Sequence, residues 1–202
     1  MNKLALHSNF ETLIENFATN QIGICDHFLS EELAAKLKID LISLFQDDQF
    51  NSAGTGNHET LQTNQLIRKD KIYWLDRNHN NPFQNSFFDL LDDFIVYLNS
   101  TCFTGITGYE FHYTYYEKDS FYKKHIDQFK NNNDRAFSMI IYLNENWKKE
   151  DGGELNIFQC NSSQLISPLS GKCVFFKSSE LAHEVLVTQL PRLSITGWLK
   201  TN

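Results

Sequence analysis

The first fifty residues repeat apolar positions mainly with the period of an α-helix. The segment SNFETLIENF (8–17) has an apolar face, and Ser8 and Glu11 stand at the spacing of a capping box, a helix N-terminus signature. The segment EELAAKLKIDLISLF (31–45) follows Ser30, a residue type that caps helices. One side of this second helix carries Leu33, Leu37, Leu41 and Leu44. We therefore expect two amphipathic helices.

Three further segments complete the first half of the chain. QIGICDHFL (21–29) is strand-like, and SFFDLLDDFIVYLN (86–99) predicts another helix. QFNSAGTGNHETLQTN (49–64) has no periodicity and carries Gly54 and Gly56. Long segments of this kind are often lids or binding loops, so we expect a surface loop here.

The second half has the pattern of short β-strands divided by polar turns. Its β-branched and aromatic runs are YEFHYTYYE, RAFSMIIYLN, GELNIF, KCVFFK, HEVLVT and RLSITGWL. Many strands without intervening helices favour a β-sandwich or a jelly-roll barrel. Helices followed by strands predict an α+β, mainly β, fold in which N-terminal helices buttress a sheet.

Composition narrows the class of protein. The chain has 202 residues, 41% of them hydrophobic and 14% aromatic, which fits one globular domain over 1–202. A net charge of −7 disfavours nucleic acid as a partner, and no segment has the length of a membrane span. Cys25, Cys102, Cys160 and Cys173 lack metal-site or disulfide spacing. We interpret them as packing residues and expect a cytoplasmic location.

The stretch FYKKHIDQF (121–129) carries the first candidate chemistry. If it is a strand, His125 and Asp127 leave on the same face. An exposed polar face would explain this without any function. The alternative is a metal site with His183 as the third ligand, because two close ligands and one remote ligand form the facial triad of non-haem Fe(II) sites.

Arg192 follows His183 by nine residues and shares one strand face with Ser194 and Thr196. A lone arginine of this kind is usually a solvated charge or part of a surface ion pair. Inside a barrel, however, a guanidinium needs an anion to offset its desolvation. A dicarboxylate co-substrate would supply that anion through bidentate hydrogen bonds.

At these residues the sequence resembles a family, the Fe(II)/2-oxoglutarate-dependent oxygenases, and within it the prolyl hydroxylase domain group. The motifs that carry the resemblance are LIRKDKIYWL (66–75), IIYLNENW (140–147), GGELNIF (152–158) and HEVLVTQLPRLSITGWL (183–199). The resemblance implies a double-stranded β-helix (jelly-roll) core over about 106–200. Residues 1–105 would then be its helical and strand support.

Carried over position by position, the resemblance implies that His125, Asp127 and His183 bind the metal. The residues implied to bind 2-oxoglutarate are Arg192, Tyr142, Tyr116 and Thr196, with Tyr115 as the alternative to Tyr116. Those implied at the substrate pocket are Tyr122, Trp198 and Arg68. The resemblance also implies a salt bridge between Asp70 and Arg135 that links the lid to the barrel. His112 is interpreted as a strand residue without chemistry.

The implied activity is hydroxylation of a prolyl residue in a protein substrate held beneath the 46–66 loop. Fe(II), 2-oxoglutarate and O2 would be required, succinate and CO2 released, and ascorbate is a candidate reductant. Two alternatives stay open. One is the same chemistry on a small molecule or free amino acid, and the other is a low-turnover oxygen or 2-oxoglutarate sensor. The oligomeric state is not predicted.

Overall fold

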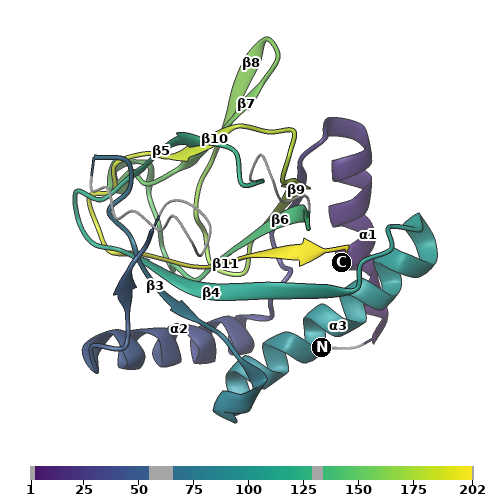
Figure 1. The fold of residues 1–202 in the computed structure, drawn as a ribbon, viewed down its shortest axis with the longest axis horizontal. Helices are drawn as coiled ribbons and strands as arrows, with labels where there is room; N and C mark the ends of the chain where they lie inside the picture. The colour runs from purple at the N-terminus through teal and green to yellow at the C-terminus, as the bar shows by residue number, and fades with distance from the viewer. Residues whose placement is uncertain (1–2, 55–65, 129–133, 202) are drawn as a thin grey trace.

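The described residues form two antiparallel sheets and three α-helices (Figure 1). The computed structural model describes residues 3–54, 66–128 and 134–201. Its helices are α1 (Lys3–Asn20), α2 (Glu31–Gln46) and α3 (Pro82–Cys102), with short 3-10 helices η1 (Arg77–His79) and η2 (Lys149–Asp151). In that part of the chain no helix is both long and apolar enough to cross a membrane.

The larger sheet has seven strands in the order β1-β9-β6-β11-β4-β3-β2. These strands are β1 (Gly23–Cys25), β2 (Asn51–Ser52), β3 (Lys71–Trp74), β4 (Gly108–Tyr116), β6 (Arg135–Tyr142), β9 (Cys173–Lys177) and β11 (Arg192–Lys200). The smaller sheet has the order β5-β10-β7-β8. Its strands are β5 (Tyr122–His125), β7 (Leu155–Gln159), β8 (Ser162–Ile166) and β10 (His183–Val185). The expected α+β, mainly β, jelly-roll architecture is confirmed.

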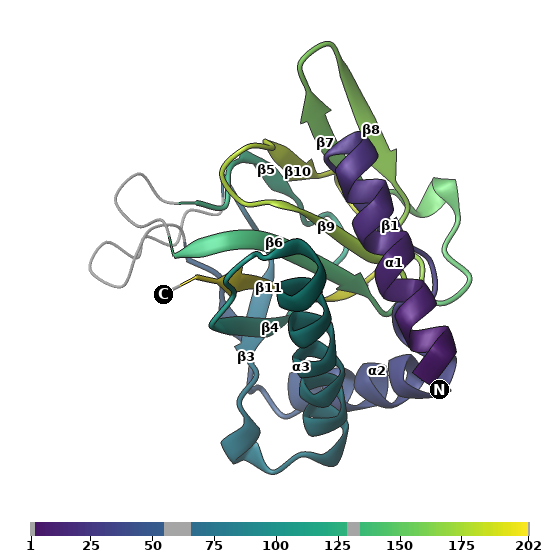
Figure 2. The ribbon, with the colours of Figure 1, turned by 90° about the vertical axis from the view of Figure 1, so that its right-hand side faces the viewer.

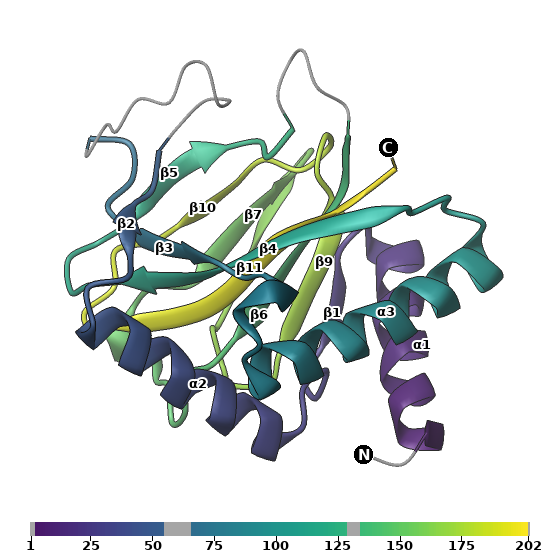
Figure 3. The ribbon, with the colours of Figure 1, turned by 60° about the horizontal axis from the view of Figure 1, so that its bottom comes forward.

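The two faces of the large sheet bury different sets of residues. In Figure 3 the helices lie on one side of this sheet and the small sheet on the other. The helix side forms an apolar core around Phe10, Leu41 and Phe94. The other side packs against the small sheet through residues such as Ile140 and Leu155. The site described below lies on that second side, between the sheets.

The two predicted N-terminal helices are present, and one of them begins earlier than expected. Ser30 caps α2, since its hydroxyl accepts a hydrogen bond from the Leu33 amide at 3.2 Å. Helix α1, however, begins at Lys3, so Ser8 lies inside the helix and the predicted capping box is wrong. The reason is tertiary, because Leu6 packs against the core and favours a longer helix. Figure 2 shows α1 as one continuous helix.

The segment predicted as support, residues 1–105, contributes strands as well as helices. Strands β1, β2 and β3 come from the first half of the chain and extend the large sheet at both edges. Most of the 49–64 segment lies outside the described residues, but Asn51–Ser52 form β2 rather than loop. The packing interpretation of the cysteines holds for Cys25 and Cys173, which are buried. It is wrong for Cys102 and Cys160, whose thiols are exposed because they lie at a helix end and a hairpin turn.

Candidate active site

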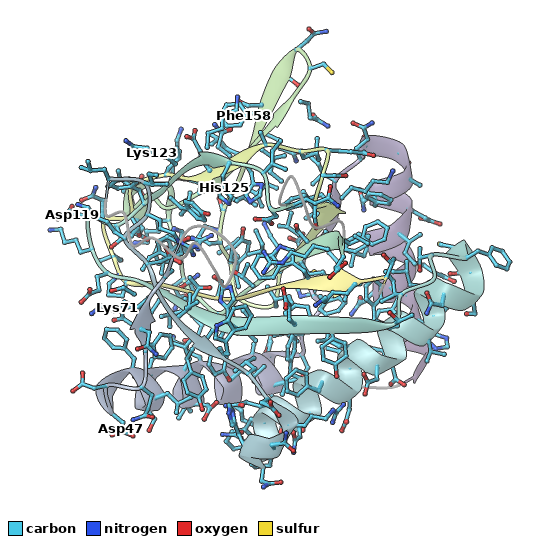
Figure 4. All side chains as sticks on the ribbon, in the orientation of Figure 1. Asp47, Lys71, Asp119, Lys123, His125 and Phe158 are labelled. Carbon is cyan, nitrogen blue, oxygen red and sulfur yellow. The ribbon has the colours of Figure 1, made fainter. Side chains whose placement is uncertain are left out.

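His125 and His183 face each other across two neighbouring strands of the small sheet. They pair directly in the register of β5 with β10, and their ring centroids are 4.3 Å apart. The Nδ1 of His125 lies 2.8 Å from the Lys123 carbonyl, and that of His183 lies 3.2 Å from the Leu181 carbonyl. A carbonyl accepts only, so Nδ1 carries the proton in both neutral rings and Nε2 keeps its lone pair. Figure 4 shows His125 between the two sheets.

Asp127 completes the group from a bend rather than from a strand. Strand β5 ends at His125, and Asp127 lies in the following bend, so strand alternation does not place it. Its Oδ1 lies 3.4 Å from His125 Nε2 and 3.7 Å from His183 Nε2. These three side chains offer ligand atoms that all lie within 4.8 Å of one another.

The protonation of this group fits a divalent metal. Burial lowers the pKa of His183, which keeps its imidazole in the neutral form that binds metals. For Asp127, burial opposes ionisation, but positive charge on the two imidazoles and the Ser138 hydroxyl together hold the pKa well below its usual range. A bound divalent cation would take the place of that positive charge. Two neutral imidazoles and one carboxylate are the ligand set of non-haem Fe(II) oxygenases, and they leave coordination positions open. The residues present therefore fit Fe(II).

Arg192 is buried on the facing sheet, where it is 1% exposed. Its Nε donates to the Gly153 carbonyl at 2.8 Å, and its guanidinium lies 5.0 Å from the rings of both Tyr116 and Tyr142. Among the described residues, Arg192 Nη2 and Tyr142 Oη are buried without a hydrogen-bond partner. Two orphaned donors side by side are costly unless a bound acceptor satisfies them. A carboxylate of 2-oxoglutarate would do so.

Gly153 makes room for this arginine. Its φ of +68° is in the left-handed region, and a Cβ there would lie 3.1 Å from the Arg192 Cδ. A side chain would thus strain the backbone and push against the arginine stem. This close approach explains the second glycine of the 152–158 motif, whereas a Cβ on the first, Gly152, would meet the Val187 carbonyl oxygen.

One cavity of about 480 Å³ joins the arginine to the three candidate metal ligands. Alternation along the strands of the large sheet supplies its floor: Tyr116, Thr114 and His112 from β4 face the same way as Arg192, Thr196 and Trp198 from β11. All of the predicted co-substrate residues except Tyr142 line this cavity, and the unpaired Tyr142 lies beside Arg192.

The structure distinguishes between Tyr116 and Tyr115. Tyr116 lines the cavity, whereas Tyr115 turns to the helix side and stacks on Phe45 with ring centroids 3.7 Å apart. Tyr122 also lines the cavity; it stacks on His125 at 3.6 Å, with the Arg68 guanidinium 4.2 Å from its ring.

The predicted Asp70–Arg135 salt bridge is wrong, because each charge has another partner. Asp70 receives a bidentate pair of hydrogen bonds from Arg68, at 2.7 and 2.5 Å. Arg135 instead donates to Glu110 at 2.8 and 2.7 Å and stacks on the Trp198 ring at 3.4 Å. All five side chains line the cavity. Asp70 and Arg135 therefore lie at the same site, but they do not pair with each other.

His112 is a strand residue, as interpreted from the sequence, and it also lines the cavity. It is buried and lies edge-on to Trp74 with ring centroids 4.9 Å apart. Its Nδ1 lies 3.2 Å from the Tyr113 carbonyl and 3.0 Å from Thr114 Oγ1. The alternation of β4, which puts His112 on the face of Tyr116, was a signal that could have identified it. Ser138, which donates to Asp127, and Ser178, which contacts Ser138, belong to no motif that the sequence made visible.

Comparison with known proteins agrees with this geometry. The sequence model of the 2OG-Fe(II) oxygenase superfamily matches residues 111–200. Human prolyl hydroxylase EGLN3 is 26% identical over 194 residues, covering 89% of this chain and 79% of the relative. A Pseudomonas putida prolyl-4-hydroxylase structure superposes with a TM-score of 0.86 at 28% identity, covering 96% of this chain and 99% of the other.

A further structure shares the fold. It is a Trichoplax adhaerens prolyl hydroxylase in complex with a hypoxia inducible factor peptide fragment, with a TM-score of 0.86 at 24% identity. The superposition covers 94% of the Trichoplax adhaerens chain and 100% of the present chain. The chain is a 2OG-Fe(II) oxygenase of the prolyl hydroxylase-like type. It is accordingly a 2-oxoglutarate-dependent dioxygenase.

Proposed function

We propose that this enzyme hydroxylates a prolyl residue of a protein substrate, using Fe(II), 2-oxoglutarate and O2. The observation that carries the proposal is one cavity that holds the three candidate metal ligands and Arg192, whose Nη2 is a buried donor without a partner. The equally unpaired Tyr142 Oη lies beside Arg192. The prolyl substrate follows from its relatives, whose names describe prolyl hydroxylases.

The residues at the two ends of the cavity have separate tasks. His125, Asp127 and His183 would hold Fe(II), and Arg192 and Tyr142 would bind the far carboxylate of 2-oxoglutarate. Burial raises the pKa of Tyr142 to about 12, so its phenol stays a hydrogen-bond donor at neutral pH. When bound, Fe(II) and 2-oxoglutarate supply the oxygen chemistry that converts a substrate C–H into C–OH while succinate and CO2 are released.

The remaining part of the cavity is suited to a substrate. Tyr122, Trp198 and Arg68 wall it, and Trp74 at its rim is 47% exposed. An aromatic wall with an exposed rim suits the apolar ring of a proline in an extended segment better than a small polar metabolite. Thr196, between the two ends, would contact the co-substrate.

Three further features belong to the proposal. Ascorbate would act as the reductant that restores Fe(II). The four free thiols are consistent with a reducing cytoplasm. The 46–66 segment would cover the bound peptide, although residues 55–65 lie outside the described part of the chain.

Mass spectrometry of the host proteome, with and without the enzyme, tests this function. Proline oxidised by one oxygen atom is expected in specific proteins, with stoichiometric succinate release. Asp127→Ala is the matched negative control. Oxidation of free amino acids with unmodified protein would favour the small-molecule alternative, and 2-oxoglutarate binding without any product would favour a sensor.

A further inference from the structure

Two buried serines stand behind the carboxylate of the metal group. The Ser138 hydroxyl donates to Asp127 Oδ2 at 2.7 Å. Ser178 Oγ lies 2.9 Å from Ser138 Oγ. Both serines are 0% exposed, so water does not compete for these hydrogen bonds. They form a short chain that runs from the end of β9 through β6 to the metal group.

The direction of this chain follows from the chemistry of the groups. The ionised Asp127 carboxylate only accepts, so the Ser138 proton goes to it. Ser138 has no second proton, and the contact to Ser178 must therefore use the Ser178 proton. Each hydroxyl is thus oriented by the next, and the donor to Asp127 is fixed rather than free to rotate.

The two oxygens of Asp127 are thereby given different roles. Oδ1 faces the Nε2 atoms of His125 and His183, whereas Oδ2 is taken by Ser138. A carboxylate can bind a metal with one oxygen or with both. If Oδ2 also bound the ion, it would occupy a position that the facial triad leaves open. 2-Oxoglutarate chelates through two positions, so no position would then be left for O2.

We propose that Ser138, oriented by Ser178, is a positioning residue that keeps Asp127 a one-oxygen ligand and so preserves an open coordination position. The proposal rests on the metal site of the proposed function, but not on the identity of the substrate. Ser178 supports the same loop through its backbone, since its carbonyl accepts from the amide of Gln128, next to Asp127, at 3.2 Å. The loop that follows β5 is therefore anchored to β9 at the ligand itself.

The test replaces Fe(II) with Mn²⁺, whose bound waters speed the relaxation of solvent protons. Mn²⁺ and 2-oxoglutarate are added to the wild type, Ser138→Ala, Ser138→Thr and Ser178→Ala, and proton relaxation is measured in each ternary complex. Ser138→Ala should lose most of the relaxation enhancement, because Oδ2 replaces the water. Ser138→Thr keeps the hydroxyl and should restore the relaxation enhancement. Ser178→Ala should give an enhancement between those of the wild type and Ser138→Ala. No turnover is needed for this readout.

Ser194→Ala is the matched control, because Ser194 is also 0% exposed but touches none of the three ligands. It should leave the relaxation enhancement unchanged. Loss of Mn²⁺ binding in Ser138→Ala, with rescue by Ser138→Thr, would also support the positioning role. Wild-type relaxation in Ser138→Ala would overturn it, as would equal losses in Ser138→Ala and Ser194→Ala. A wild-type chain that binds no Mn²⁺ would count against the proposed function itself.

Discussion

His183 lies directly opposite His125 in the pairing of β10 with β5, although 58 positions separate the two residues in the sequence. The same residue also pairs with Ile157 on its other side, so it stands in the middle of the small sheet. A central strand position holds the imidazole rigidly, which a metal ligand requires.

Replacing this central histidine should cost most of the metal affinity. His183→Ala removes one of three ligands, so we expect Fe(II) or Co²⁺ affinity to fall by at least about 100-fold, beyond the range typical of an outer partner. Isothermal titration of the metal-free protein measures this. His79→Ala, outside the site, is the control. Unchanged affinity in His183→Ala would remove this residue from the ligand set.

Removing the buried arginine should affect the co-substrate and spare the metal. Arg192→Ala leaves the carboxylate without its bidentate partner, a loss of about 2–5 kcal/mol, or roughly thirtyfold or more in 2-oxoglutarate affinity. Arg192→Lys should rescue little, because an ammonium cannot reproduce the fork. The measurement is the 2-oxoglutarate Kd of each variant beside its Mn²⁺ Kd. Equal weakening of both constants would contradict an anchoring role.

His112 should make the stability of the metal-free protein depend on pH. Burial, followed by the charge of Arg68, lowers the pKa of His112 to about 4, below the ordinary value of about 6.5 in an unfolded chain. The unfolded state therefore binds more protons between these values. The contribution of His112 to the free energy of unfolding is therefore fully present above about pH 6.5. It is lost as the pH drops toward 4, by on the order of 3 kcal/mol.

Thermal unfolding across this range checks the prediction against His112→Gln, which cannot be charged. The variant should show a shallower fall in Tm between pH 6.5 and 4. A residual slope of the same sign is expected from His183, whose pKa burial also lowers. Identical slopes in both proteins would mean that His112 is not held neutral.

The partner of Asp70 can be identified by a double-mutant cycle. Arg68 donates two hydrogen bonds to this carboxylate, whose residue is 2% exposed. Arg68→Ala leaves a buried charge uncompensated, so we expect a loss of about 3–5 kcal/mol in unfolding free energy, recovered in part by adding Asp70→Asn. The cycle of Asp70 with Arg135 should show little coupling. The reverse order of coupling energies would restore the pairing expected from the family.

Asp40 should be important for stability although it is far from the chemistry. Its carboxylate accepts from Tyr113 Oη at 2.9 Å, Gln84 Nε2 at 2.8 Å and Asn81 Nδ2 at 2.7 Å, which ties α2 to β4 and α3. Asp40→Ala leaves buried donors unpaired, and we expect about 2–4 kcal/mol of destabilisation by urea unfolding. Asp47→Ala, at the exposed end of α2, should cost less than about 1 kcal/mol. Metal affinity should be unchanged in the folded fraction of both variants.

Local rules explain what could be predicted from the sequence. The Ser30 cap and the leucine face of α2 depend on neighbours within one or two turns, so the helix was predicted with its correct start. Seven of the strands, β1 and six in the second half of the chain, were likewise visible as apolar runs. The position of Ser8 inside α1 was missed because Leu6, which is partly buried, packs against the core, and this tertiary contact favours a helix that begins before Ser8.

The candidate metal ligands and the buried arginine were predicted from the sequence alone, because residue type, spacing and the resemblance to a known family are all read along the chain. Only the tertiary structure decided which side chains meet. The register between distant strands and the pleat of β4 select Tyr116 over Tyr115. In the same way Arg68 instead of Arg135 reaches Asp70, and Ser138 takes the second oxygen of Asp127. These pairings depend on contacts between segments far apart in the chain, and no periodicity along the chain encodes them.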